Sequence, residues 1–207
     1  MELEFTPDQD ELRDAVRAVL VRECPMSLVR EVVEKGIPAD GLWAQMVALG
    51  WPALTVPEDH GGLGFGMVEL AVVLEELGRV DAPGPFLATV SRYVPLVQEA
   101  GSAAQHAELL PPVAAGERTG TIAVAPDGVT AEPTGAGYRL RGTAAIVADP
   151  GADDVAVVAR VTGHADLAHD VVTARHHRDR GDAGVGREHG FDLHRVDVVP
   201  ALSLIHI

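Results

Sequence analysis

The feature that most constrains the fold is a change in the spacing of apolar residues at Thr119. Before this residue, apolar side chains recur at intervals of three and four, which is the period of an amphipathic helix. After it, short β-branched runs such as residues 121–125 are separated by turn residues, which is typical of strands. A helical unit followed by a strand unit predicts an α+β chain with two domains of different class.

Residues 1–115 are expected to form an all-helical domain. Thr6 and Gln9 have the spacing of a capping box, and Pro7 suits the first position of a helix. Further helices are expected at residues 28–34, 42–50, 67–77, 86–100 and 102–110. The helix at 67–77 is apolar nearly all round, which predicts a central, buried helix.

Proline residues predict three interruptions in this domain. Two prolines lie within residues 51–57, so we expect this stretch to be extended. Residues 83–85 should form a rigid break, and Pro111 and Pro112 should end the last helix.

Residues 119–163 are expected to form a partial antiparallel β-barrel or sandwich domain. Strand-like runs lie at 121–125, 129–132, 138–141, 144–148 and 155–161. The glycine-containing stretch 134–137 separates two of these runs as the turn of a hairpin would.

Residues 164–207 differ from the rest of the chain in composition. Seven of the nine histidines lie there, and residues 164–189 show neither the helical nor the strand period. Their residue types are those that GC-rich DNA encodes in a wrong reading frame. We therefore expect a frameshifted or adapter-derived tail, in which only the alternation at 191–200 favours a strand.

Composition excludes several classes of function. Sixteen basic and 31 acidic residues give a net charge of −15, which opposes binding to nucleic acid or anionic lipid. No run approaches the roughly 20 apolar residues of a membrane span. A single cysteine excludes an internal disulfide, and the acidic first residues lack the pattern of a signal peptide, which predicts a cytoplasmic location.

The glycine-rich residues 60–66 could be compared with a dinucleotide-binding loop. Glu58 and Asp59 would then lie beside a pyrophosphate, and no βαβ unit surrounds the loop. A structural glycine turn that leads into a helix is the favoured interpretation.

Other candidate reactive groups also have structural interpretations. Cys24 has no evident histidine partner, which favours a core thiol over a nucleophile. Glu75 and Glu76 point about 100° apart on a helix, so they are not an acid/base pair. The histidines of the tail have no scaffold to hold a metal, and no metal site is predicted.

Three linked motifs resemble the amino-terminal domain of the acyl-CoA dehydrogenases. They are Leu-Trp to Leu-Gly-Trp-Pro at 42–52, Val-Pro-Glu-Asp-His-Gly-Gly-Leu-Gly at 56–64, and Val-Leu-Glu-Glu-Leu-Gly-Arg at 73–79. Residues 141–160 resemble the middle β domain of the same family, and the whole resemblance covers residues 5–161. Residues 83–90 are similar to the high-GC bacterial branch that includes subunits acting on steroid side-chain thioesters.

The resemblance implies an FAD-dependent oxidoreductase of lipid metabolism, such as fatty acid β-oxidation. It would remove the α-hydrogen of an acyl-CoA as a proton and the β-hydrogen as a hydride to the flavin, which produces a 2-enoyl-CoA. The family also has a C-terminal four-helix bundle that usually carries the catalytic glutamate. This bundle is missing here, so no catalytic residue is assigned. The implied partners are an electron-transfer flavoprotein or a similar acceptor, in a homo- or hetero-oligomer.

The resemblance also implies where cofactor and substrate would be contacted. Family members place a threonine and a tryptophan beside the flavin, where this sequence has Val124 and Ile146. The candidate cofactor contacts are therefore backbone groups of Ala123, Val124 and Ala148. The candidate residues of the acyl channel are Phe86, Leu87 and Val90.

Two functional interpretations remain open at this point. The chain could be a fragment of a catalytic acyl-CoA dehydrogenase that is inactive alone. The alternative is a non-catalytic structural subunit of a heteromeric acyl-CoA dehydrogenase. The replaced flavin positions favour the second interpretation, and the frequency of catalytic members in the family favours the first.

Overall fold

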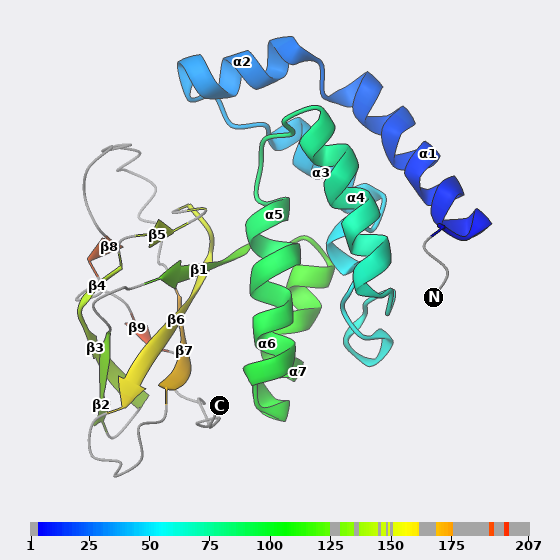
Figure 1. Cartoon of the computed structure of the whole chain (residues 1–207). Helices are drawn as coiled ribbons and strands as arrows, with labels where there is room; N and C mark the ends of the chain where they lie inside the picture. Colours follow the sequence, from blue (N-terminus) through cyan, green and yellow to red (C-terminus); the bar gives the residue numbers. More distant parts are fainter. Residues whose placement is uncertain are drawn as a thin grey trace.

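The computed structural model describes residues 4–124, 129–134, 137–144, 146–147, 149, 151–161, 169–175, 191–192 and 197–198. The helical unit lies on one side of the molecule and the strands on the other (Figure 1). The last helix ends at Ala114 and the first strand begins at Gly120. This confirms the change of class predicted at Thr119.

The helices form in the order that the apolar spacing predicts. They are α1 (Pro7–Glu23), α2 (Met26–Lys35), α3 (Asp40–Ala48), α4 (Met67–Arg79), α5 (Phe86–Ala88), α6 (Val94–Ala100) and α7 (Ala103–Ala114). Short 3₁₀ turns lie at η1 (Trp51–Ala53) and η2 (Glu58–His60), and the π-helical turn η3 (Thr89–Tyr93) joins α5 to α6. The capping box of Thr6 and Gln9 begins α1 as expected, and Gly36 ends α2 in the left-handed conformation.

Two expectations based on proline are wrong. Residues 51–57 are not extended, because Trp51–Ala53 forms a 3₁₀ turn, whose φ angles match the value that a proline ring imposes. Helix α7 does not end at Pro111 but continues through both prolines to Ala114. Burial of Leu110 and Val113 in the core offsets the helical hydrogen bonds that the prolines cannot donate.

Helix α4 is less buried than its composition predicts. Leu70, Val73 and Leu77 lie in the core, whereas the side chains of Met67 and Val68 are 64% and 49% exposed. The helix therefore buries one face, and its large exposed apolar residues, Met67 and Val68, lie at its first turn.

Two clusters of buried apolar side chains lie within the described residues. The first joins α1 to α4 with the segments at Trp51 and Phe86; its members are Val16, Leu20, Cys24, Val29, Leu42, Met46, Trp51, Leu54, Leu70, Val73, Leu77, Phe86 and Val90. The second joins α6 and α7 to the sheet through Ala156; its other members are Ala53, Val56, Tyr93, Val94, Val97, Leu109, Leu110, Val113 and Ala114. The helical unit and the sheet thus share a core.

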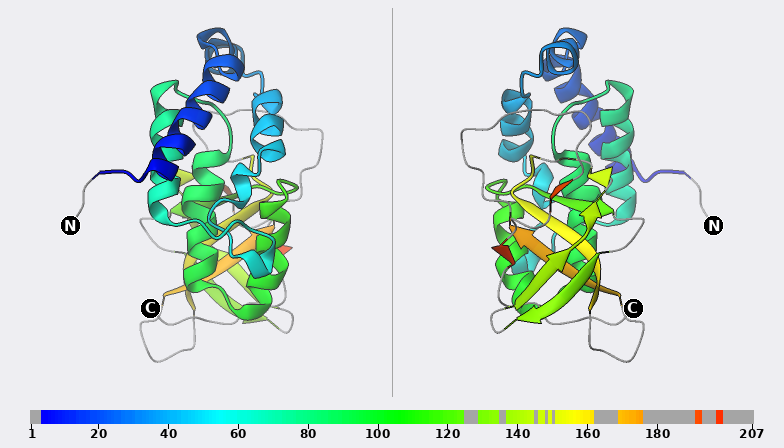
Figure 2. Two further views of the ribbon diagram at one scale, coloured as in Figure 1. Left: turned by 90° about the vertical axis from the view of Figure 1, so that its right-hand side faces the viewer. Right: turned by 90° about the vertical axis from the view of Figure 1, so that its left-hand side faces the viewer.

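In the part of the chain that the structure describes, seven strands form a mixed sheet, and the other two, Thr143–Ala144 and Phe191–Asp192, pair antiparallel in a separate sheet. The strands are β1 (Gly120–Val124), β2 (Thr130–Thr134), β3 (Gly137–Arg141), β4 (Thr143–Ala144), β5 (Ile146–Val147), β6 (Asp154–Val161), β7 (His169–Arg175), β8 (Phe191–Asp192) and β9 (Asp197–Val198). The hairpin predicted around 134–137 is the antiparallel pair of β2 and β3. Strands β1 and β2 run parallel to β6. The expectation of a wholly antiparallel sheet is therefore wrong. The two views of Figure 2 show helices in front of strands from one side and strands in front of helices from the other.

Part of the segment that lacks a sequence period is a strand. Residues His169–Arg175 form β7, which pairs antiparallel with β6 along its whole length. The expectation that residues 164–189 lack regular structure is therefore wrong for these seven residues. An edge of β6 can recruit any extended chain through backbone hydrogen bonds, and Val171 and Val172 suit a strand. The strand expected within 191–200 is present as β8 and β9, and a frameshifted origin for residues 164–207 stays a prediction.

Candidate functional site

The two segments proposed to face the flavin lie side by side in the sheet. Ala123 pairs with Val147, and Val124 pairs with Ile146, where β1 meets β5. Ala123 also pairs with Val157 of β6, and its side chain is buried. Ala148 lies outside the described residues. The structure therefore brings together the segments that the sequence singled out, and their contact with a flavin stays a prediction.

The three candidate acyl-channel residues differ in accessibility. Phe86 and Val90 belong to the first hydrophobic cluster, where Phe86 packs edge-on against Trp51 with 6.4 Å between ring centroids. Leu87 lies on the other face of the same helix, and its side chain is 50% exposed. Among the three, Leu87 is the residue whose side chain can reach a ligand without a rearrangement of the core.

A buried hydroxyl links this helix to the sheet. Thr89 Oγ1 donates a hydrogen bond to the Gly120 carbonyl and accepts one from the Gly120 N–H, both at 3.1 Å. The sequence does not indicate this pair, because Thr89 and Gly120 lie 31 residues apart. The one available signal was a threonine between the apolar residues Ala88 and Val90.

An open cleft of about 520 Å³ lies where α2 and α3 approach the first residues of β1 and β6. Its lining combines apolar with acidic residues; it comprises Val32, Pro38, Ala39, Asp40, Trp43, Gly84, Pro85, Gly116, Glu117, Thr119, Asp149 and Asp153. Among the described residues that line it, Phe86, Leu87, Val90 and Ala123 do not appear. The cleft lies at the start of β1, whereas Val124 ends that strand.

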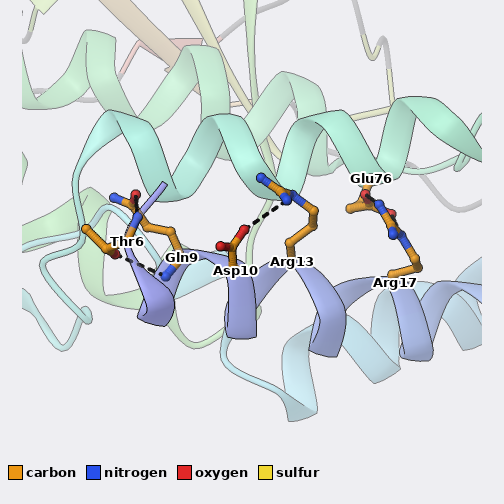
Figure 3. A network of polar contacts seen from close by, with 6 residues as sticks. All are labelled: Thr6, Gln9, Asp10, Arg13, Arg17 and Glu76. Atoms are coloured by element: carbon orange, nitrogen blue, oxygen red, sulfur yellow. Dashed lines mark hydrogen bonds and ion pairs between the residues drawn. The ribbon is translucent and has the colours of Figure 1, made fainter. Parts of the chain in front are cut away.

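Glu76 is a buried carboxylate that the sequence did not reveal. Its oxygens accept hydrogen bonds from Arg17 at 2.6 and 3.0 Å (Figure 3), and one of them accepts a further hydrogen bond from Arg79 at 2.9 Å. The hydrogen bond from Arg17 is the main cause that lowers the pKa of Glu76 to about 2. Gln9 also binds Glu69 at 2.8 Å, so polar contacts hold α1 beside α4 at two levels. These contacts stabilise the helical unit, and none of them faces the candidate cofactor segments.

The remaining candidate groups have structural roles. Cys24 is buried in the core, and burial raises the pKa of its thiol, which opposes a nucleophilic role. Gly62 approaches Val56 so closely that a Cβ would overlap the Val56 backbone, which explains a glycine there without a phosphate. In the described part of the chain, no group of three metal-ligating side chains converges, and no helix has the length and apolarity to cross a membrane.

Comparison with known proteins identifies the family. Residues 6–117, more than half of the chain, match the family described as acyl-CoA dehydrogenase, N-terminal domain. The chain belongs to the acyl-CoA dehydrogenase family. The match confirms the resemblance carried by the motifs at 42–79.

Relatives and solved structures agree with this assignment. Acyl-CoA dehydrogenase IpdE2 of Mycolicibacterium smegmatis is 32% identical over 125 residues, which are 59% of this chain and 39% of that protein. The ChsE4-ChsE5 complex from Mycobacterium tuberculosis has a chain that is 28% identical with a TM-score of 0.75; the match covers 90% of this chain and 50% of that one. A variant of the Tcur3481-Tcur3483 steroid ACAD is 30% identical with a TM-score of 0.69, over 81% of this chain and 48% of that one. This acyl-CoA dehydrogenase chain thus spans half or less of the length of these relatives.

Proposed function

We propose that this chain is the amino-terminal and middle part of a flavin-dependent acyl-CoA dehydrogenase. The reaction is the α,β-dehydrogenation of an acyl-CoA thioester to a 2-enoyl-CoA. The observation that carries this proposal is the combination of the family match over 6–117 with a helical unit joined to a sheet, as in the solved relatives. We propose further that the 207-residue chain is inactive alone, because it spans half or less of those relatives.

The described residues do not by themselves make a flavin site. Ala123 has strand partners on both sides and a buried side chain, so it offers little to a flavin ring. At positions 124 and 146, which pair where β1 meets β5, the sequence has valine and isoleucine, residue types without a hydroxyl or an aromatic ring. We therefore assign FAD to the longer parent protein, in which this edge would form one wall and residues outside this chain the others.

An acyl-CoA is the proposed substrate. In this proposal Leu87 contributes to the wall of the acyl channel, and Phe86 and Val90 support it from the core. Similarity to a protein named as a steroid ACAD favours a steroid side-chain thioester over a simple fatty acyl chain. The proposed electron acceptor is an electron-transfer flavoprotein or a similar carrier. A cytoplasmic location stays a prediction from the sequence.

A second candidate is a non-catalytic subunit of a heteromeric acyl-CoA dehydrogenase. The observation that favours it is similarity to a chain of the ChsE4-ChsE5 complex, together with the absence of the usual flavin-binding side chains at Val124 and Ile146. In this role the chain would stabilise an active partner subunit without carrying out chemistry itself.

The experiment that tests both candidates compares the 207-residue chain with the longer parent protein. We expect the chain alone to be colourless and unable to reduce a dye acceptor with any acyl-CoA. A parent that purifies yellow and active supports the first candidate, whereas a parent that holds flavin only with a partner subunit supports the second. In the parent, Val124→Thr should increase flavin retention because it restores a hydroxyl donor. Stoichiometric flavin on the 207-residue chain would contradict the proposal that it is inactive alone.

A further inference from the structure

We propose that Thr89 is a positioning residue that sets the spacing between the acyl wall at Leu87 and the flavin edge at Val124. The inference rests on the proposed function for Leu87 and Val124. The joint between helix and sheet, by which we mean the two hydrogen bonds between Thr89 and Gly120, rests on the described contacts alone. Leu87 lies two residues before Thr89 in one continuous helix. Val124 lies four residues after Gly120 in β1, which corresponds to about 13 Å of strand.

The helical side of the joint holds Gly120 from two directions. Thr89 and Tyr93 are the first and last residues of the π-helical turn, and both are fully buried. The Thr89 hydroxyl satisfies both backbone groups of Gly120. The Tyr93 ring lies so close that a Cβ at position 120 would overlap it. Turns of this π-helical type are rare and occur frequently at functional sites, which supports a specific role for this one.

The sheet side of the joint is also fixed. Asp153 Oδ2 accepts hydrogen bonds from the N–H and the hydroxyl of Thr119, at 2.9 and 3.0 Å. Arg118 pairs with the fully buried Asp154 at 3.3 Å. Strand β1 then continues between β5 and β6 to Val124. The start of β1 is therefore held in a fixed position relative to the rest of the sheet. Thr89 connects that sheet to the helix that carries Leu87.

The matched variants are Thr89→Val and Thr89→Ser. Valine has nearly the shape of threonine but leaves the Gly120 N–H and carbonyl without the hydroxyl, whereas serine keeps it. In the 207-residue chain, we expect Thr89→Val to speed hydrogen exchange at the Gly120 amide by about tenfold, and Thr89→Ser to restore slow exchange. Spin labels at the exposed positions Glu99 and Arg141, in a Cys24→Ala background, should give one narrow distance distribution that broadens in Thr89→Val.

Several results would contradict the proposal that the Thr89 hydroxyl holds the sheet to the helix. Equal exchange rates and equal distance distributions in all three proteins would show that the hydroxyl does not hold the sheet. The same broadening in Thr89→Ser would show that the methyl group matters instead. If Thr89→Val does not fold, the test is the hydrogen-exchange rate of the Gly120 amide in the unmodified chain and in Thr89→Ser. Exchange as fast as that of an exposed amide in these two proteins contradicts the proposal.

The positioning role is tested in the flavin-bearing parent protein. We expect Thr89→Val to lower kcat for flavin reduction by about tenfold at unchanged flavin content and with little change in KM, and Thr89→Ser to restore it. An unchanged kcat with a loosened joint would overturn the positioning role. A parent that neither holds flavin nor dehydrogenates an acyl-CoA, alone or with a partner subunit, would refute the proposed function, while the exchange and distance results would still report on the contact between Thr89 and Gly120.

Discussion

A carboxylate without solvent contact stays charged at Glu76 because two arginines neutralise it. Its side chain is 1% exposed, whereas the side chains of Arg17 and Arg79 are 45% and 43% exposed. The arginines therefore bury part of their length and keep contact with water. The desolvation cost is therefore lower than that of a fully buried ion pair, because only the carboxylate is removed from water.

Replacement of Glu76 by glutamine should make the stability difference depend on pH. The pKa of Glu76 in the folded chain, about 2, lies below its usual value of 4.5, so the ionised form stabilises the folded state above about pH 4.5. We expect Glu76→Gln to lower the free energy of unfolding by about 2 kcal/mol at pH 7. The difference from the unmodified chain should shrink as the pH falls from about 4.5 to about 2.

Urea denaturation at a series of pH values measures this effect. Glu75→Gln is the matched control, since Glu75 is the exposed neighbour on the same helix, and it should change the free energy by less than about 0.5 kcal/mol. A Glu76→Gln difference that persisted at pH 2 would mean that ionisation is not its source.

Glycine at position 62 is required by packing against the backbone of Val56. We expect Gly62→Ala to destabilise the chain by roughly 3 kcal/mol, because the new methyl group would overlap a carbonyl that cannot move freely. Gly41→Ala is the control: a Cβ there has no neighbour within 4 Å, and alanine in α3 should stabilise by about 0.5 to 1 kcal/mol. Denaturation midpoints measure both, and equal stability of the two variants would refute the packing explanation.

At the scale of elements, capping signals and the signal of the β2–β3 hairpin are reliable, whereas the proline signals at 51–57 and 111–112 and the pairing of distant strands are not. The capping boxes at Thr6 and Ser102 and the left-handed Gly36 each depend on residues within one turn. The parallel pairing of β1 with β6 joins Gly120 to Asp154 across 34 residues, and no turn sequence encodes it. Hairpin β2–β3 was predictable because its two strands follow each other closely in the sequence, with a glycine-containing stretch between them.

Strand β7 allows a direct test between two expectations: the structure pairs it with β6, whereas the composition of residues 164–189 predicts no regular structure. Backbone hydrogen bonds to β6 should slow hydrogen exchange along Val171 to Ala174 relative to the rate of an unstructured peptide. Proteolysis combined with mass spectrometry can localise this protection to His169–Arg175. Exchange at the unstructured rate would mean that β7 does not form in solution and that the expectation from composition is correct.

At the scale of the whole molecule, the two units differ in class but share a core. Ala156 of β6 is part of the second cluster, and Ile122 of β1 packs against that cluster. Along the sequence, the chain therefore divides into a helical unit and a strand unit. At their junction the two units pack together around one cluster of apolar side chains.

A shortened chain of residues 1–116 tests this description. We expect its circular dichroism to be almost purely helical, because its described elements are helices and turns. We also expect a lower melting temperature than that of the 207-residue chain, since the apolar groups that contact Ile122 and Ala156 would become exposed. Substantial sheet signal in residues 1–116 would contradict the division at Thr119.

The sequence by itself determined the order of helical and strand units, the main helix caps, the β2–β3 hairpin and the family. Each of these depends on residues that are near one another in the chain or on linked motifs at set spacings. Tertiary structure alone decided that Phe86 and Val90 are buried while Leu87 is exposed, that arginines neutralise Glu76, and that Thr89 holds Gly120. The physical reason is that burial and long-range hydrogen bonds arise when distant segments pack together, and a local pattern of residue types does not specify which segments meet.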